Sequence, residues 1–225
     1  MNETLSVIIP AYNAEKYLPE ALRSISTAVG DKLPQPQIIV VNDGSTDGTS
    51  SVALAGNSFL IEKERGGAAS ARNKGLAVSS GELIAFLDAD DIYTLEALEV
   101  LCSALCESGA DAVFAMMEDF ISPELTQEER ATLSIRHGPY YGSLPGCSLI
   151  RRRLFDLLGA FDETLHSGET VQWLLKMRDS GVKTIQLERI TAKRRIHLNN
   201  TGRIERAMEM KNYASIIRGR RSHSP

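Results

Sequence analysis

Two short apolar runs rich in β-branched residues constrain the fold of this chain more than any other feature. The runs "LSVIIP" (5–10) and "QIIVVND" (37–43) lack polar alternation, which is typical of strands buried on both faces. Apolar residues recur at helical spacing from Tyr17 to Ile25, and Asn13 is the expected N-cap. Strands that alternate with helices predict an α/β fold, a Rossmann-like and mostly parallel sheet with helices on both faces.

The same alternation continues along the chain. After residue 118 the pattern weakens, and the polar stretch 119–145 is expected to be a long loop with one helical turn. We expect no internal repeat and no linker that would divide residues 1–225 into separate domains. The remaining predicted elements are a short helical piece before a strand at 59–62, further strands at 83–87, 110–117 and 182–187, and helices at 68–78, 94–107, 169–180 and 204–217. The stretch "GCSLIRRRLFDLLGAFDE" (146–163) is expected to be a strand followed by a short helix.

Composition narrows the class of protein. The 225 residues have a formal net charge of −4, which argues against a surface devoted to nucleic acid. The stretch from Arg189 to Pro225 is nevertheless basic, and it is a candidate for peripheral contact with a membrane; a solvated basic tail is the alternative. The sequence shows no signal-peptide pattern and no long apolar span, so a cytoplasmic location is expected. The three cysteines form no metal-ligand pattern with the histidines.

Polar residues follow three of the predicted strands where each strand ends. They lie in the stretches 10–13, 42–45 and 88–91, and the carboxyl ends of parallel strands form the usual ligand crevice. Asp88, Asp90 and Asp91 raise one another's ionisation cost, so a positive partner is expected there. Mg²⁺ or Mn²⁺ with a diphosphate would supply that charge. The alternative is that Asp91 caps the next helix.

Two further motifs have a structural and a functional interpretation. Asp43 at its strand end is placed to accept hydrogen bonds from a base or ribose, although the turn "DGSTDG" would also use an Asp. Gly66 and Gly67 before a helix suit phosphate binding, a weak signal alone. Arg72 would contact the nucleotide or hold the first loop.

The segments "VIIPAYNAEKYLPEALRSI", "VNDGSTDGT" and "GGAASARNKGLAVSSGELIAFLDADD" together resemble the family 2 glycosyltransferases with the GT-A fold. The similarity is strong over residues 4–115 and continues more weakly through "FDETLHSGETVQWLLKM" and "RRIHLNN". It implies metal-assisted, inverting transfer of a sugar from a nucleotide sugar, most often a uridine diphosphate sugar. Residues 1–115 would form the donor half, 116–203 the half that binds a saccharide, lipid-linked or peptide acceptor, and 204–225 a helix and basic tail.

The resemblance also implies roles for individual residues. Asp90 would be the main metal contact, joined by His197, and Arg194 and Arg195 would attract the diphosphate. Trp173 would lie on the acceptor side. The expected nucleotide-binding residues are Pro10, Ala11, Tyr12, Asn13, Asp43, Gly67, Arg72, Asp88 and Ala89.

The general base is where the chain departs from the family pattern. The family has Glu-Asp before a helix, with the Asp as base, whereas "GETVQW" has Glu169 followed by Thr170. A threonine hydroxyl is not a base near neutral pH, so Glu169 is the expected catalytic carboxylate, with Asp162 and Glu163 as alternatives. A nucleotide-sugar-binding protein without catalysis is the second functional hypothesis. A nucleotidyltransferase is the third, and it is disfavoured because no basic glycine-rich loop follows the first strand.

Overall fold

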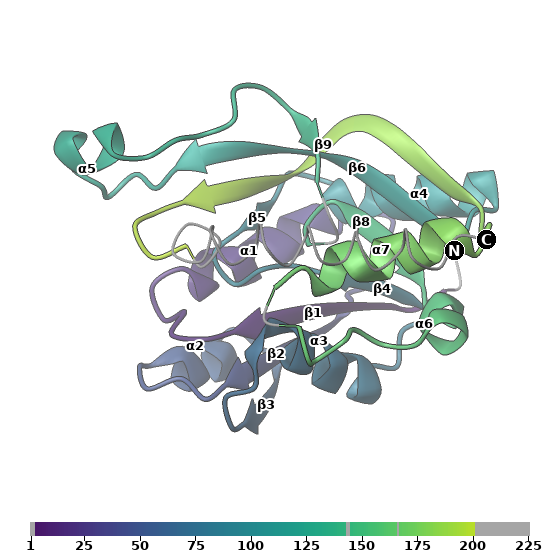
Figure 1. Cartoon of the computed structure of the whole chain (residues 1–225), viewed down its shortest axis with the longest axis horizontal. Helices are drawn as coiled ribbons and strands as arrows, with labels where there is room; N and C mark the ends of the chain where they lie inside the picture. The colour runs from purple at the N-terminus through teal and green to yellow at the C-terminus, as the bar shows by residue number, and fades with distance from the viewer. Residues whose placement is uncertain (1–2, 143–144, 166, 201–225) are drawn as a thin grey trace, which may run out of the picture.

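A nine-stranded sheet with the order β3-β2-β1-β4-β8-β6-β9-β5 organises the computed structural model, in which β7 pairs with β6 (Figure 1). The structure describes residues 3–142, 145–165 and 167–200. The strands are β1 (Leu5–Ala11), β2 (Gln37–Asp43), β3 (Phe59–Lys63), β4 (Leu83–Phe86), β5 (Ile92–Tyr93), β6 (Ala112–Ile121), β7 (Tyr140–Tyr141), β8 (Ser148–Arg151) and β9 (Thr184–Ile196).

The two parts of the sheet differ in strand direction. β3, β2, β1 and β4 are parallel neighbours, whereas β8 is antiparallel to both β4 and β6. β6 and β9 run parallel over a long pairing with a register shift near Met116, and β5 is antiparallel to β9. The sheet is therefore mixed but mostly parallel, as the sequence predicts.

Helices cover both faces of the sheet. α1, α2 and α4 contribute to one core cluster, and α3, α6 and α7 contribute to the other. Gly75 lets α3 approach β1 closely, because a Cβ there would lie 2.4 Å from a methyl carbon of Ile8. The helices are α1 (Leu18–Ala28), α2 (Thr49–Ala55), α3 (Gly67–Val78), α4 (Ala97–Ser108), α5 (Gln127–Ala131), α6 (Arg153–Leu158) and α7 (Glu169–Asp179).

Most predicted elements are found at the expected places, and two expectations about helix caps are wrong. Asn13 does not cap α1; the helix begins at Leu18 after Tyr17, and Asn13 has a φ of 47°. Asp91 does not cap a helix, because β5 follows it and α4 begins only at Ala97. Among its described residues, the stretch 119–145 is mostly loop with one short helix, α5, as predicted, although β6 continues to Ile121 and β7 adds a short strand.

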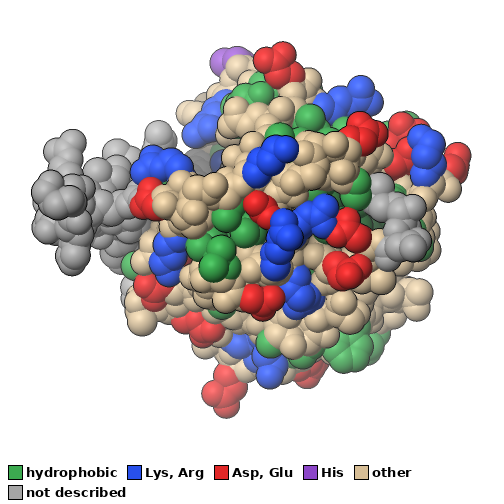
Figure 2. All heavy atoms as spheres, turned by 90° about the vertical axis from the view of Figure 1, so that its right-hand side faces the viewer, with side chains coloured by type: hydrophobic (Ala, Val, Ile, Leu, Met, Phe, Trp, Pro, Cys, Tyr) green, Lys and Arg blue, Asp and Glu red, His purple; other side chains and the backbone are tan. Residues whose placement is uncertain are grey.

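The predicted helix at 204–217 and the basic tail lie outside the described residues. Within the described part of the chain, no helix is long and apolar enough to cross a bilayer. Figure 2 shows the edge of the sheet opposite the strand-end loops, where acidic and basic side chains are interspersed. The face in this view therefore offers no extended patch of a single charge.

Candidate functional site

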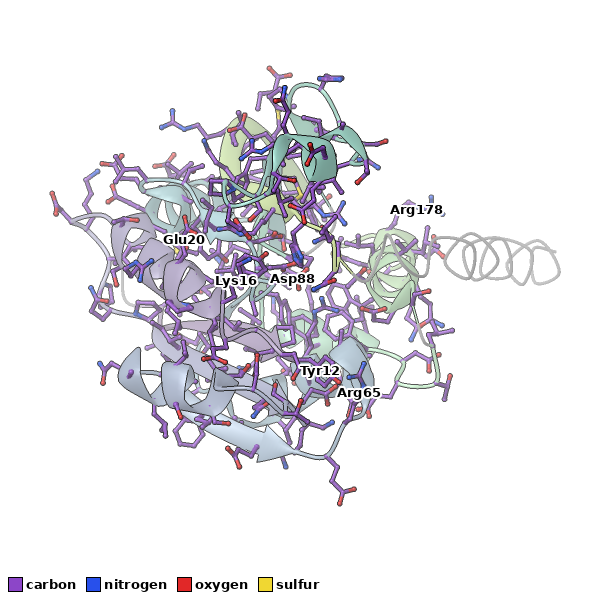
Figure 3. The ribbon with its side chains drawn as sticks, turned by 90° about the vertical axis from the view of Figure 1, so that its left-hand side faces the viewer. Tyr12, Lys16, Glu20, Arg65, Asp88 and Arg178 are labelled. Atoms are coloured by element: carbon purple, nitrogen blue, oxygen red, sulfur yellow. The ribbon has the colours of Figure 1, made fainter. Side chains whose placement is uncertain are left out.

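The loops after β1 and β2 are held together at the carboxyl edge of the sheet, which faces the viewer in Figure 3. The backbone N–H of Asn13 donates to Ser45 Oγ at 2.9 Å, and Asn13 Oδ1 accepts from the Thr46 N–H at 2.9 Å. Glu15 accepts from the Gly48 N–H, and its own N–H donates to Asp47. These reciprocal bonds fix both loops, and with them the residues that precede and follow them.

Tyr12 is exposed at this edge, and the Arg65 guanidinium lies over its ring. Its side chain is 43% exposed, and the Arg65 Cζ atom is 3.4 Å from the ring centroid. Pro10 and Ala11 belong to β1, and Ala11 is buried. Tyr12 thus provides an aromatic surface of the kind on which bases stack.

Asp43, at the end of β2, organises the loop before α3. Its Oδ1 accepts from Lys63 Nζ at 2.5 Å and from the Gly66 N–H at 2.9 Å, and its Oδ2 accepts from the Gly67 N–H at 2.8 Å. Gly67 has a φ of 88°, which favours glycine, and a Cβ there would meet no atom within 4 Å. Both carboxylate oxygens are therefore engaged within the protein, by the loop before α3 and not by the turn that follows Asp43.

Arg72 connects the end of β4 to the start of α7. Its Nη1 donates to Glu169 Oε1 at 2.5 Å, and its Nη2 donates to Asp88 Oδ1 at 2.9 Å. Arg72 is only 5% exposed, and its Nε is the one buried side-chain nitrogen or oxygen without a partner among the described residues. Burial opposes the charge, but the two carboxylates outweigh it and raise the pKa of Arg72. The predicted contact with a nucleotide is therefore not available in this structure.

Asp90 and His197 come together from opposite halves of the sequence. His197 Nε2 lies 3.0 Å from Asp90 Oδ2, and Asn200 Nδ2 donates to the same oxygen at 3.2 Å. Ala89 is buried between the two carboxylates of the motif, and the Asp88 side chain is 38% exposed. The predicted pair of metal ligands is thus adjacent.

The donor set of Asp90 and His197 fits a divalent cation that completes its coordination with ligand oxygens. No group of three or more His, Cys, Asp or Glu side chains suited to a metal occurs within residues 3–142, 145–165 and 167–200. A hard cation bound at a diphosphate needs only one or two protein ligands, because phosphate oxygens and water supply the rest. The pair therefore suits a metal that binds together with a phosphorylated ligand.

Asp91 and Arg195 are buried next to Asp90 and are hydrogen-bonded to each other. The Arg195 N–H donates to Asp91 Oδ1 at 2.9 Å, and the guanidinium donates to Glu20, Ser122 and the Asp90 carbonyl. Burial, and then the charges of Asp90 and Asp88, raise the pKa of Asp91 well above its usual range. The prediction that Arg195 attracts a diphosphate is wrong, because the residue is 2% exposed and fully engaged.

Trp173 belongs to the core, which corrects its predicted place on the acceptor side. Its ring is fully buried and stacked on Phe155 at 4.6 Å, and its Nε1 donates to the Gly159 carbonyl at 2.8 Å. The aromatic ring anchors α7 against the sheet instead of facing a ligand. Its apolar helical spacing favoured this role, because large aromatic residues are most often core residues.

The three candidate bases differ in their partners. Asp162 accepts from Thr164 and from Gln172, and hydrogen bonds from these two lower its pKa. Glu163 accepts from Asn73, and this bond is the main reason that its pKa is lowered. Glu169 begins α7 and accepts from Arg72 through Oε1, whereas no described residue donates to Oε2. Lowered pKa values make Asp162 and Glu163 weaker bases than ordinary carboxylates.

Sequence reasoning missed Asn200 and Tyr17. Asn200 orients Asp90, and the Tyr17 ring lies 4.6 Å from the His197 ring. The Tyr17 hydroxyl donates to Glu124, which ties the segment after β6 to the start of α1. In the sequence, Tyr17 stands only among the apolar residues of a helical pattern. Its partner Glu124 and the Asn200 partner Asp90 are about 100 or more residues away in the sequence, so no local pattern could have identified these contacts.

Comparison with known proteins assigns the chain to a family. A family model described as glycosyl transferase family 2 matches residues 6–159. The chain belongs to glycosyl transferase family 2. Glycosyltransferase GlyG of Streptococcus pneumoniae is 30% identical over 184 residues, which cover 69% of this chain and 59% of GlyG. The hyaluronan synthase of Pasteurella multocida is 26% identical over 230 residues, or 95% of this chain but 22% of the synthase. The chain thus spans less than two thirds of these relatives.

Solved structures of other proteins share the fold. TarS of S. aureus, residues 1–349 in complex with UDP-GlcNAc, aligns with a TM-score of 0.71 at 23% identity. The alignment covers 88% of this chain and 60% of the TarS chain. The mannosyltransferase PcManGT from Pyrobaculum calidifontis, in complex with GDP-Man and Mn²⁺, aligns with a TM-score of 0.67 at 20% identity. This alignment covers 97% of this chain and 65% of the PcManGT chain. The predicted GT-A fold is confirmed.

Proposed function

We propose that this chain is a glycosyltransferase that moves a sugar from a nucleoside-diphosphate sugar, with uridine as the base, to an acceptor hydroxyl with inversion. One observation carries the proposal: Tyr12, Asp88 and Asp90 converge with the loop organised by Asp43 at one carboxyl edge of a family 2 domain. The complexes of TarS with UDP-GlcNAc and of PcManGT with GDP-Man and Mn²⁺ support this class of donor.

In this proposal Asp90 and His197 hold Mg²⁺ or Mn²⁺. The metal would stabilise the negative charge that develops on the departing diphosphate. Asn200 holds Asp90 Oδ2 in place, and the partly exposed Asp88 is available to the ribose. Tyr12 provides the surface for the base, and the backbones of Pro10, Ala11, Asn13 and Gly67 line the same edge.

Glu169 is the proposed base. An acceptor hydroxyl has to lose a proton as it attacks, and Glu169 Oε2 accepts no bond from the described residues. Arg72 holds the other oxygen at 2.5 Å and so fixes the carboxylate. The acceptor, a saccharide, a lipid-linked saccharide or a peptide, would bind over residues 116–203, with the basic stretch after Arg189 as a peripheral membrane contact.

The proposal is tested by calorimetry of UDP binding with Mn²⁺ and with chelator. Wild-type protein should bind UDP at least tenfold more tightly with Mn²⁺, and Asp90→Ala should remove the difference. An unchanged circular dichroism spectrum and melting temperature would show that the variant is folded. Equal affinity with and without metal in the wild type would contradict the metal-assisted mechanism.

The base is tested separately by Glu169→Gln. Transfer, or donor hydrolysis when no acceptor is supplied, should fall about a hundredfold, the scale of lost general-base catalysis. UDP affinity should stay the same, because the base acts on the acceptor. Glu163→Gln is the matched control and should leave turnover unchanged; the opposite pattern would transfer the role to Glu163.

Thr170 and the Arg72–Glu169 ion pair favour a second candidate, a nucleotide-sugar-binding protein without catalysis. A wild type that binds UDP-sugars but neither hydrolyses nor transfers them would support this candidate. Gain of turnover in Thr170→Asp would then indicate that the missing carboxylate is the cause.

A further inference from the structure

Arg136 and Arg194 both contact the Tyr140 side chain, in the part of the chain proposed to bind the acceptor. The Arg136 Cζ atom lies 4.4 Å from the centroid of the Tyr140 ring, and the Arg194 guanidinium donates a hydrogen bond to the Tyr140 hydroxyl oxygen. We propose that the two arginines bind an anionic group of the acceptor, a phosphate or a carboxylate. This inference rests on the proposed function and adds that the acceptor of the transfer is negatively charged.

The first support is the position of Arg194 next to the proposed metal site. β6 and β9 run in the same direction as β1, so Arg194 near the end of β9 lies at the carboxyl edge of the sheet (Figure 1). Arg195, the next residue, donates to the Asp90 carbonyl and pairs with Glu20 of α1. Successive side chains of a strand point to opposite faces, so Arg194 faces away from α1. An acceptor bound beside the metal would adjoin this position.

The second support is that the two guanidinium groups lack a carboxylate partner. Within residues 3–142, 145–165 and 167–200, neither Arg136 nor Arg194 forms an ion pair. Asp119, which lies opposite Arg194 in the strand pairing, accepts from the Tyr140 hydroxyl at 2.5 Å and from the Arg136 backbone N–H at 2.9 Å. Burial, and then the bond to Asp119, raise the pKa of Tyr140 to about 12, so its hydroxyl is neutral at pH 7. Two cations thus flank a tyrosine and its one carboxylate partner.

The third support is a fixed frame around the arginines. Tyr140 belongs to β7 and packs against the small core cluster that contains Met117 and Ala192. The Arg136 backbone, in the segment before β7, is tied to β6 through Asp119. An arginine presents its N–H donors in a planar fork that matches the oxygens of a phosphate or a carboxylate, and such charge-assisted bonds are strong. The frame therefore keeps two of these forks at one tyrosine.

The experiment measures the binding of inorganic phosphate and of glucuronate by ligand-observed NMR, with the protein saturated with UDP and Mg²⁺ so that the diphosphate site is occupied. Both anions should bind to the wild type, and the tighter one indicates whether the acceptor carries phosphates or carboxylates. Arg194→Gln and Arg136→Gln should each weaken anion binding about tenfold, the scale of a lost charge-assisted hydrogen bond. Arg194→Lys keeps the charge and should lose less. UDP affinity should not change in these variants.

Lys193→Gln is the matched control, because Lys193 precedes Arg194 on β9 but forms an ion pair with Glu118 at 3.1 Å. Its affinity for both anions should equal that of wild type, and an equal loss there would overturn the site. A UDP-loaded wild type that binds neither anion, or an Arg194→Gln variant that binds both as tightly as wild type, would overturn the site alone. A loss of UDP affinity in Arg194→Gln would also overturn it, because Arg194 would then contact the diphosphate. A wild type that binds no UDP would overturn the proposed function, on which the site rests.

Discussion

At the residue scale, the buried charged side chains at the carboxyl edge of the sheet contact an opposite charge or a backbone dipole. Arg72 is matched by two carboxylates, and Arg195 by Glu20 and the Asp90 carbonyl. A buried charge left without its partner costs several kcal/mol, about 3–5 when one member of a pair is removed. Substitutions here therefore affect folding as well as ligands.

Asp43 gives a direct test of this arrangement. Asp43→Ala leaves the donors of Lys63, Gly66 and Gly67 without their acceptor, so the free energy of unfolding should fall by about 2–4 kcal/mol. Asp43→Asn keeps one acceptor oxygen and should show a smaller loss. Urea denaturation measures both. If Asp43→Ala were as stable as wild type while UDP binding was lost, Asp43 would be a nucleotide contact and not an organiser of the loop.

The residue scale also shows how far a sequence can predict a site. The strand-end residues could be identified because a buried strand followed by carboxylates is a local pattern. The partners of these residues could not: Arg72 meets Glu169 and Asp90 meets His197 across about 100 residues. The sequence predicts that Arg72 contacts the nucleotide or holds the first loop and that Arg195 attracts the diphosphate, and only the tertiary structure shows that both are buried.

At the element scale, β6 and β9 extend well beyond their predicted ends. Many of the added residues are polar or charged, and local propensity assigns such residues to loops. In the sheet, Glu118 pairs with Lys193 and Asp119 with Arg194, and the Glu118–Lys193 side chains form an ion pair of 3.1 Å. Opposite charges on β6 and β9 thus stabilise a pairing that the sequence of neither strand indicates by itself. The strands and helices of the first half were predictable because they are set by their own periodicity.

Glu124 joins the segment after β6 to α1 and makes this contact dependent on pH. Burial opposes its ionisation, but hydrogen bonds from Lys16, Ser122 and Tyr17 outweigh burial and lower the pKa of the carboxyl. A lowered folded-state pKa means that the stabilisation is present above the pKa of the unfolded chain, about 4.3, and is lost as the pH falls below it.

Glu124→Gln should therefore be less stable than wild type at pH 7, and the difference in unfolding free energy should shrink as the pH is lowered to 3. Urea denaturation at several pH values measures this difference. Glu128→Gln, an exposed glutamate on α5, is the control and should track wild type throughout. A Glu124→Gln difference that stayed constant with pH would show that the effect is one of packing.

At the scale of the whole molecule, the sheet passes without interruption from one half of the sequence to the other. β4 of the first half pairs with β8 of the second, and Arg195 reaches back to Glu20 over 175 positions in the sequence. A single domain for residues 1–225 stays a prediction. A single domain of this size should unfold cooperatively.

Two buried cysteines test that cooperativity. Cys102 lies in the core cluster around α4, and Cys147 lies beside Met117 and Ala192 in the second half. Burial raises the pKa of both thiols to about 12, so neither reacts with iodoacetamide at pH 8 in the native state. With Cys106→Ser as background, both should become reactive at the same urea concentration. Labelling of Cys147 at clearly lower urea would show that the second half unfolds alone.

The position of β9 between β6 and β5 has a consequence for synthesis. β9 is the last strand in the described part of the chain, yet it lies inside the sheet, where it pairs with β6 through Ile196. A ribosome adds about 5–20 residues per second, so the nascent chain carries an unpaired β6 edge for several seconds before β9 emerges. Such an edge invites pairing with other chains. The chain therefore depends on its final described strand to leave the ribosome in a form that does not associate with its neighbours.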